Sequence, residues 1–321
     1  MKNIFTLLAL TISLSMNAQL AAVTENSNTG QRLSTSTAAN HGNIGNKAVD
    51  LSWSSSSSST KGATGAASTA MGQNVTAEGS YSTAIGNVVS SIGTNSTAMG
   101  VYSIANGYGS TAIGERNTTN GNRSTAMGYY TTTSDFGSFA IGTYNNSLSS
   151  LTTNGSAVGY DVHNTAFVIG NGADSDNKSD AFKVMFNGDA TVSNDLTVSN
   201  DLTVSGDVVV SSDARLKSNI VSLGSTLSRL LLIDGKTYTM IKDGKQKIGV
   251  LAQDIKEVFP ELVSEDANEM LAVNYQGLVP VLINALKEQQ SEIDVLKEQE
   301  SKYLEQEKRL ERLEKLVAQL D

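Results

Sequence analysis

Apolar and polar positions repeat every fourteen residues through much of the first half of the chain. The units have the form Ser-Thr-Ala-Met/Ile-Gly, with Phe in place of Thr in the last, and begin at Ser68, Ser82, Ser96, Ser110, Ser124 and Ser138. Further glycines fall midway, at Gly65, Gly79, Gly93, Gly107 and Gly121, so the underlying period is seven; Asp135 interrupts it. A fixed short period predicts stacked structural units.

The repeat predicts a β-solenoid. Each seven-residue half has room for one short strand and one tight corner, and glycine permits the positive φ that corners use. Strand side chains alternate, so Ala lies on one face and Met or Ile on the other. Six coils spaced ~4.8 Å apart would span roughly 25–30 Å. A single roll would leave its Met and Ile in water, which favours association of identical chains.

Charged residues are sparse in these repeats: between Gly62 and Gly142 they are Glu78, Glu115, Arg116, Arg123 and Asp135. Together with the Ser-Thr-Ala-Met-Gly units, this segment resembles the head repeats of YadA-type trimeric adhesins. The resemblance covers residues 62–142. It implies a trimeric left-handed β-roll head.

A second repeat follows a connector that we place at residues 143–190. The sequence Ser-Asn-Asp-Leu-Thr-Val begins at Ser193 and again at Ser199, then degenerates from Ser205. Its period of six, with alternating Leu and Val, resembles the intertwined trimeric β-stalks of phage fibres. We therefore expect a β-stalk over residues 191–211, in which three chains share one core. An ordinary pair of hairpins is the alternative.

From Ser212 onward Lys, Glu and Leu become frequent and Gly sparse. Residues 249–259 have the pattern of a short amphipathic helix that Pro260 would end. Residues 282–320 have helical periodicity, with apolar residues at sevens: Leu282, Leu296, Tyr303, Leu310 and Val317. Leu313 and Leu320 fill the second seam position only in the last two heptads. The pattern predicts an imperfect coiled coil over residues 288–321, with a solvated single helix as the alternative.

The N-terminal residues predict export. Lys2 precedes an apolar run from Ile4 to about Leu14, with Ala18 near its end, as in a secretory signal peptide over residues 1–18. The run is shorter than the ~20 residues of a spanning helix. Residues 19–61 are rich in Ser, Thr and Asn, with Trp53 as the one large aromatic, and we expect them to form a flexible linker. A secreted or cell-surface location follows, with no membrane-spanning segment.

Composition excludes several kinds of site. The chain has no cysteine and two histidines, His41 and His163, which excludes thiolate and disulfide chemistry and disfavours zinc. Its net charge of −9 argues against nucleic-acid binding. A segment similar to a calcium loop, with Asp174, Asp176, Asn177 and Asp180, has Lys178 and Ser179 where a ligand and a glycine belong. We expect no metal and no cofactor.

Three ordered sequence blocks lie between Ser212 and Lys287. They are Ser212-Asp-Ala-Arg-Leu-Lys217, then Gly249–Gln253 through Phe259–Val263, then Val273–Pro280 running into Ala285–Lys287. Residues 212–287 resemble the C-terminal intramolecular chaperone of phage endosialidases and tail fibres, a family of self-cleaving serine peptidases. The resemblance implies an α+β chaperone domain whose only enzymatic act is one cut in its own chain.

By the same resemblance the cut falls between Ser211 and Ser212, with Ser212 as nucleophile and Lys217 as base. A serine hydroxyl needs a neighbour to take its proton. Lysine can do so only when neutral, which requires burial or nearby positive charge to lower its pKa. Arg215 is a candidate for that charge. The alternative is that Ser212 and Lys217 are solvated linker residues.

The expected fold is therefore a mainly β fibre, with β-roll head and β-stalk, followed by an α+β chaperone domain and a C-terminal coiled coil. The expected function is a homotrimeric fibre or adhesin-like surface protein. One alternative is a fibre whose head binds or degrades a surface glycan; Tyr102, Tyr108, Tyr129, Tyr130 and Tyr144 could stack on sugars. A glycosidase needs paired carboxylates, and Glu78, Glu115 and Asp135 are isolated.

Two further classes fit less well. An autotransporter adhesin would end in alternating apolar strands, whereas residues 282–320 are rich in Glu and Lys. A transcription factor that shares the chaperone segment would need a basic domain, which the composition does not supply.

Overall fold

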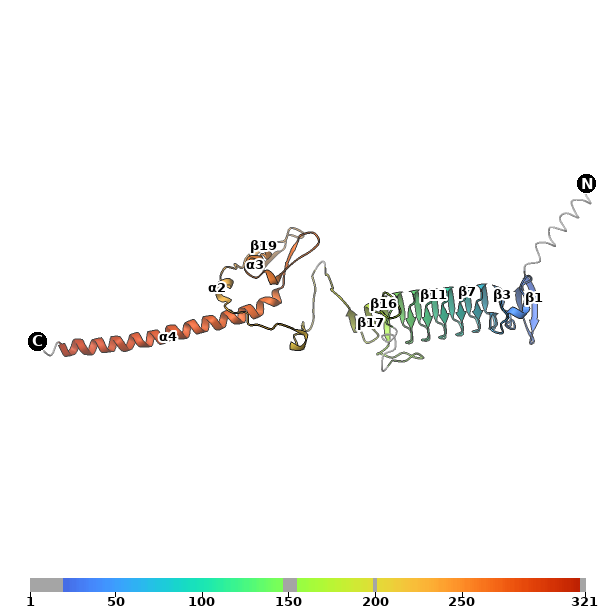
Figure 1. The fold of residues 1–321 in the computed structure, drawn as a ribbon, viewed down its shortest axis with the longest axis horizontal. Coiled ribbons are helices and arrows are strands. Elements are labelled where there is room, and N and C mark those ends of the chain that lie inside the picture. The colour runs from blue at the N-terminus through green and yellow to red at the C-terminus, as the bar shows by residue number, and fades with distance from the viewer. Residues whose placement is uncertain (1–19, 147–154, 199–200, 318–321) are drawn as a thin grey trace, which may run out of the picture. The chain divides into compact units, whose positions relative to one another are not determined.

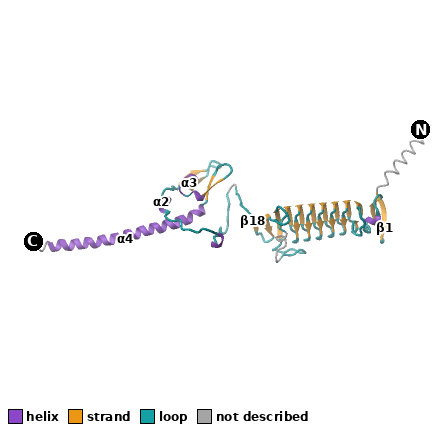
Figure 2. Ribbon diagram, viewed as in Figure 1, coloured by secondary structure: helices purple, strands orange, loops and turns teal. Residues whose placement is uncertain are grey.

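The computed structural model describes residues 20–146, 155–198 and 201–317 (Figure 1). The expected signal peptide at 1–18 lies outside these residues. The chain divides into two compact units, residues 1–203 and 204–321. Strands dominate the first unit, and helices with two small sheets make up the second (Figure 2).

The repeats form a β-solenoid, as predicted. Each coil gives one five-residue strand to a long sheet and one two-residue strand to a second sheet. The long-sheet strands are β3 (Val49–Trp53), β5 (Thr69–Gln73), β7 (Thr83–Asn87), β9 (Thr97–Val101), β11 (Thr111–Glu115), β13 (Thr125–Tyr129) and β15 (Phe139–Thr143). The second sheet contains β4 (Gly62–Ala63), β6 (Thr76–Ala77), β8 (Ser90–Ser91), β10 (Ile104–Ala105), β12 (Thr118–Thr119) and β14 (Thr132–Thr133).

Successive coils pair in parallel with the fourteen-residue register of the sequence. Thr83 of β7 pairs with Thr97 of β9, and Thr97 pairs with Thr111 of β11. The alanine of each unit is fully buried, as the predicted alternation requires: Ala70, Ala84, Ala98, Ala112, Ala126 and Ala140. The Met or Ile that follows faces outward and keeps part of its side chain in solvent. The core of the roll is therefore narrow and continuous from coil to coil.

The glycine that ends each unit is required by the stacking. Gly86 has φ +137°, and a Cβ there would lie 1.9 Å from the carbonyl oxygen of Gly100 in the next coil. No side chain fits at that distance, and L-residues avoid this backbone region. The same close approach recurs between Gly100 and Gly114, which explains why the repeat tolerates no other residue there.

The structure differs from the expected flexible linker at residues 19–61. Here β1 (Leu20–Glu25) and β2 (Asn28–Leu33) form an antiparallel hairpin, and β2 pairs in parallel with β3. A 3-10 turn, η1 (Ala38–Asn40), lies between β2 and β3. The hairpin thus covers the N-terminal end of the solenoid sheet.

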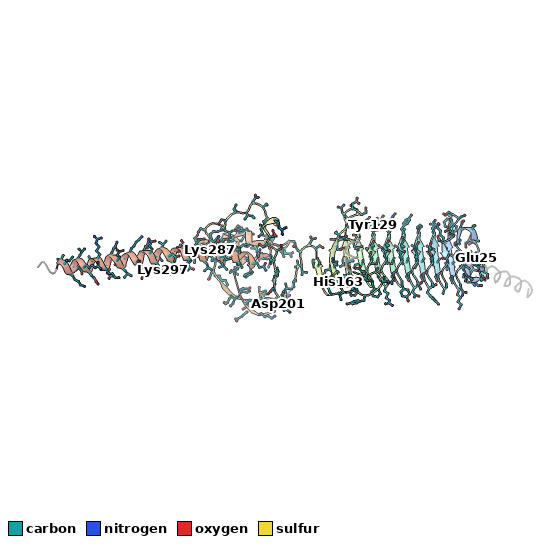
Figure 3. The ribbon with its side chains drawn as sticks, turned by 90° about the horizontal axis from the view of Figure 1, so that it is seen from below. Glu25, Tyr129, His163, Asp201, Lys287 and Lys297 are labelled. Atoms are coloured by element: carbon teal, nitrogen blue, oxygen red, sulfur yellow. The ribbon has the colours of Figure 1, made fainter. Side chains whose placement is uncertain are left out.

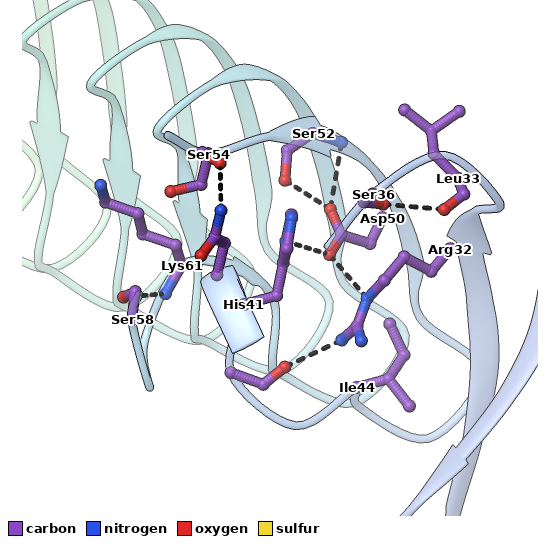
Figure 4. A network of polar contacts seen from close by, with 12 residues as sticks. Arg32, Leu33, Ser36, His41, Ile44, Asp50, Ser52, Ser54, Ser58 and Lys61 are labelled. Atoms are coloured by element: carbon purple, nitrogen blue, oxygen red, sulfur yellow. Dashed lines mark hydrogen bonds and ion pairs between the residues drawn. The ribbon is translucent and has the colours of Figure 1, made fainter. Parts of the chain in front are cut away.

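A buried polar network explains why this polar segment is ordered (Figure 4). Asp50 is 0 % exposed and accepts hydrogen bonds from Ser52 and from the Arg32 guanidinium, while His41 Nδ1 lies 2.9 Å from its carboxylate. Arg32 also forms an ion pair with Glu25 at 2.8 Å. Pairing and hydrogen bonds offset the cost of burying these charges, and Ile44 and Ala48 of the same segment join the apolar core of the solenoid.

The sheet continues past the last repeat. Strand β16 (Thr165–Asn171) pairs in parallel with β15, and β17 (Asp180–Met185) and β18 (Ala190–Val192) extend it antiparallel. Asp135, which interrupts the glycine pattern, is buried and accepts a 2.8 Å hydrogen bond from the Thr165 amide. Burial raises the pKa of this carboxyl. Asp135 thus joins the last coil to the strand that replaces the repeat.

Of the stalk predicted at 191–211, only Thr191 and Val192 lie in a strand among the described residues, at the end of β18. Among residues 193–198 and 201–211, the described part of the stalk repeat, no strand is present. Leu196 and Leu202 occupy equivalent repeat positions, and each is 68 % exposed. The apolar side chains of this segment therefore have no core of their own in a single chain.

The second unit is a small α+β domain with one long helix. Its elements are η2 (Ala214–Leu216), α2 (Leu227–Leu230), β19 (Lys236–Thr239), β20 (Gln246–Gly249), α3 (Ala252–Val258), η3 (Pro260–Leu262), β21 (Val263–Glu265), β22 (Leu271–Val273), η4 (Tyr275–Gly277) and α4 (Leu278–Val317). Helix α3 ends before Pro260, as predicted, but it begins at Ala252 rather than Gly249, which is the last residue of β20. Ile255 and Phe259 pack against Val281 of α4 to form the core.

Helix α4 has 40 residues, of which only Val281 and Ala285 near its start are buried. Leu278 also packs on the core, whereas residues 289–317 are exposed (Figure 3), including the predicted seam residues Leu296, Tyr303 and Leu310. The helix is confirmed, and the coiled coil remains a prediction. Among the described helices, none is long and apolar enough to cross a membrane.

Candidate self-cleavage site

A tight turn lies at the start of the second unit, directly after the stalk residues. Asp213 accepts a 2.8 Å hydrogen bond from the Arg215 amide and so caps the 3-10 turn η2. The Leu216 amide then bonds to the Asp213 carbonyl, and the Lys217 amide to that of Ala214, each at 3.1 Å. Because the chain turns once within three residues, Lys217 is directed back toward the start of the turn.

The turn brings together the two residues that the resemblance designated as nucleophile and base. Lys217 Nζ lies 2.6 Å from Ser212 Oγ, within hydrogen-bond distance. Proton transfer between two groups requires this proximity before any question of pKa arises. Residues 211–217 are all exposed in the single chain, so solvent reaches both side chains.

Arg215 was a candidate for the positive charge that lowers the pKa of Lys217, but in the structure this charge is paired. Its guanidinium pairs with the Asp213 carboxylate, with Nη2 to Oδ2 at 2.6 Å and Nε to Oδ1 at 3.0 Å. This side-chain bond, followed by the bond from the Arg215 amide, lowers the pKa of Asp213. The same contact raises the pKa of Arg215. The charge of Arg215 is therefore balanced within the turn.

Sequence reasoning missed Asp213, although a signal for it was present. Aspartate immediately before a short turn is a preferred capping residue, and an arginine two residues later can fold back onto it. The spacing Asp-x-Arg inside the Ser212–Lys217 block would have pointed to this pair.

Two family models match separate parts of the chain. Residues 212–264 match the family described as chaperone of endosialidase. Residues 63–87, 91–116 and 120–145 match the YadA head domain repeat. The segments that match YadA head repeats therefore precede a segment that matches the chaperone of endosialidase. No curated protein matches the chain.

Residues 225–227, which follow the turn η2 in the sequence, are hydrogen-bonded to helix α4. The Glu288 carboxylate accepts hydrogen bonds from the Ser225 hydroxyl at 2.6 Å and from the Thr226 and Leu227 amides at 2.6 and 3.2 Å. Thr226 is fully buried, and its hydroxyl also donates to the Val281 carbonyl. These bonds, led by that from Ser225, lower the pKa of Glu288.

The calcium-like loop is bonded internally. Asp174 accepts hydrogen bonds from the amides of Asp176 and Asn177 and from the Asn177 side chain. Asp180 lies at the start of β17, where it accepts a bond from the Asn146 amide. Within the described ranges, no group of three or more Asp, Glu or His side chains is arranged to hold a metal ion.

Three tyrosines near the C-terminal end of the solenoid, Tyr129, Tyr130 and Tyr144, contact one another. The rings of Tyr130 and Tyr144 are parallel at 4.7 Å, and the Arg116 guanidinium lies over the rings of both Tyr102 and Tyr130. A bond with Tyr129 raises the pKa of Tyr144 to about 12. Tyr130 and Tyr144 are thus engaged within the chain, whereas Tyr102, Tyr108 and Tyr129 remain exposed.

Proposed function

We propose that this protein is an exported trimeric fibre or adhesin-like surface protein whose chaperone folds the trimer and then releases itself by one cut. The proposed order of parts is signal peptide (1–18), N-terminal segment (19–61), head (62–142), connector (143–190), stalk (191–211), chaperone (212–287) and coiled coil (288–321). The supporting observation is the 2.6 Å contact between Lys217 Nζ and Ser212 Oγ, inside a segment that matches the chaperone of endosialidase.

The proposed chemistry uses these two side chains and one water molecule. Neutral Lys217 accepts the proton of Ser212 as Oγ attacks the carbonyl carbon of Ser211. The bond from that carbon to the Ser212 nitrogen breaks, and Lys217 returns the proton to this nitrogen. Water then hydrolyses the ester between Ser211 and Ser212. The products are a carboxylate at Ser211 and a free amine and hydroxyl at Ser212.

Assembly of three chains supplies what the single chain lacks. A lysine in water is protonated at neutral pH, and burial favours its neutral form. Residues 211–217 are exposed in one chain, so the proposed trimer would create the burial and cleavage would follow assembly. An unassembled chain would then remain uncut and keep its chaperone.

Exposed apolar surfaces in each part support a trimer. Met71 and Met127 stand outward on the long sheet of the head. Leu196 and Leu202 are exposed in the stalk, and Leu296 and Leu310 on α4. Surfaces of this kind distributed along a chain are typical of chains that associate along their length.

Export rests on the N-terminal pattern of residues 1–18, and the proposed partner is a ligand at the surface where the fibre acts. A fusion of residues 1–30 to a reporter that is active only after export tests the proposed export.

The autoproteolysis is tested by expression of the full chain with Ser212→Ala as the variant. Intact mass and N-terminal sequencing should find a wild-type fragment that starts at Ser212, whereas the variant stays whole. A variant cut at the same bond would refute the assignment.

A further inference from the structure

Asp213 lies between the proposed nucleophile and the turn that positions the proposed base. Its Oδ1 accepts hydrogen bonds from the Arg215 amide and from Arg215 Nε, and its Oδ2 accepts one from Arg215 Nη2. One carboxylate therefore both caps the turn and binds the arginine, whose side chain is 88 % exposed. The cap stabilises the turn, whereas an exposed ion pair contributes little to stability.

The turn contains three ionisable side chains, those of Asp213, Arg215 and Lys217. An unpaired carboxylate beside Ser212 would favour the protonated form of Lys217 and so oppose its use as a base. A guanidinium bound to that carboxylate cancels this effect, because the pair has no net charge. The capping bond is retained at the same time.

We propose that Asp213 and Arg215 form a charge-neutral positioning pair for the Ser212–Lys217 dyad. Asp213 caps the turn that directs Lys217 onto Ser212, and Arg215 neutralises the charge that this cap would otherwise place beside the lysine. The inference rests on the proposed self-cleavage. It adds two positioning residues and assigns them opposite electrostatic effects on the same base.

The two halves of the pair should change the pH dependence of cleavage in opposite directions. Asp213→Asn keeps an oxygen that can accept the capping bond but leaves the Arg215 charge unbalanced, which favours neutral Lys217. The rate should then rise at a lower pH than in the wild type. Arg215→Gln leaves the Asp213 charge unbalanced, so its rate should rise at a higher pH. Each shift should be roughly 0.5–1 pH unit.

The double variant Asp213→Asn/Arg215→Gln again has no net charge and should return toward the wild-type profile. Arg215→Lys keeps the positive charge, so its pH profile should also stay near that of the wild type. Asp234→Asn is the matched control, because Asp234 forms an exposed ion pair with Lys236 two residues later in the same unit. It should not shift the profile.

The experiment starts from full-length precursor purified in denaturant and diluted into buffers of defined pH. Loss of the precursor band gives the rate, and light scattering at each pH gives the fraction assembled, so that folding and cleavage are separated. Opposite shifts of the single variants and recovery in the double variant support the proposal. Shifts in one direction, or none, in assembled variants overturn it. Cleavage of Ser212→Ala would instead overturn the proposed self-cleavage itself.

Discussion

Glu288 of α4 accepts a 2.6 Å hydrogen bond from the backbone amide of Thr226, the residue before α2 begins. With Ser225 and Leu227 as further donors, one carboxylate binds three successive residues of the chaperone. It also supplies an acceptor for amides at the start of α2 that have no partner within that helix, as a capping side chain does. The long helix and the chain that leads from the proposed cleavage site are therefore joined at Glu288.

We expect Glu288→Ala to lower the thermal unfolding temperature of the uncut chain, because the Thr226 and Leu227 amides lose their acceptor. The effect should depend on pH. The pKa of Glu288 is depressed in the folded state, so its contribution is present above the unfolded pKa of about 4.3 and is lost as pH falls through the folded value. Melting curves between pH 7 and pH 3 should therefore converge for wild type and variant at acid pH. Glu305→Ala, in the exposed part of α4, is the control. Parallel curves at every pH would contradict this role.

The contact between Lys217 and Ser212 forms within one chain, which predicts that each chain cuts itself. Wild-type and Ser212→Ala chains with different tags, expressed together, should form mixed trimers in which only wild-type chains are cut. Lys217→Arg should leave its own chain whole, because arginine remains protonated. Mass analysis of each tagged chain provides the measurement. Cleavage of Ser212→Ala chains within mixed trimers would show that the nucleophile comes from a neighbour.

Removal of the chaperone should make the stability of the fibre kinetic. Heated and cooled, the cleaved trimer should fail to recover its β-sheet signal. The uncut Ser212→Ala trimer, which still contains residues 212–321, should recover at least in part. Circular dichroism and sedimentation before and after the cycle test this. Equal recovery of the two proteins would argue against a folding role.

The solenoid should not tolerate a side chain where coils approach closely. Gly86→Ala places a Cβ 1.9 Å from the Gly100 carbonyl oxygen, at φ +137°, and should destabilise the head by about 3 kcal/mol or more. Gly109→Ala is the matched control: its φ is +63°, and its Cβ would meet only Arg123 Cγ at 3.7 Å. It should cost about 1 kcal/mol. Unfolding rates in denaturant compare the two, and similar rates would refute the steric argument.

The repeat region could be predicted in detail because residues that are equivalent in the sequence repeat are also the residues that pair between neighbouring strands. The alternation of Ala with Met or Ile fixed which side chain is buried, and Pro260 marked the end of α3. These are local signals, and they needed no knowledge of distant contacts.

The N-terminal segment could not be predicted in this way. Arg32 and Asp50 are eighteen residues apart, and His41 reaches the same carboxylate from a third position. From composition alone such polar residues are expected to be solvated, whereas in the fold they form hydrogen bonds and ion pairs with one another. Asp213 was missed for a related reason, since its role depends on Arg215 folding back onto it. Ser212 and Lys217 came from a family resemblance, and their spacing alone was a weak pattern.

The fourteen-residue register has a consequence for how such a fibre changes over generations. Each coil pairs with the next through identical positions, and non-repeat strands close both ends, β2 pairing with β3 and β16 with β15. Duplication or loss of one whole unit in the gene would therefore leave both closures intact. Each event would lengthen or shorten the head by one step of about 4.8 Å. Recombination between repeats could thus adjust the reach of the head in fixed increments without redesign of its ends.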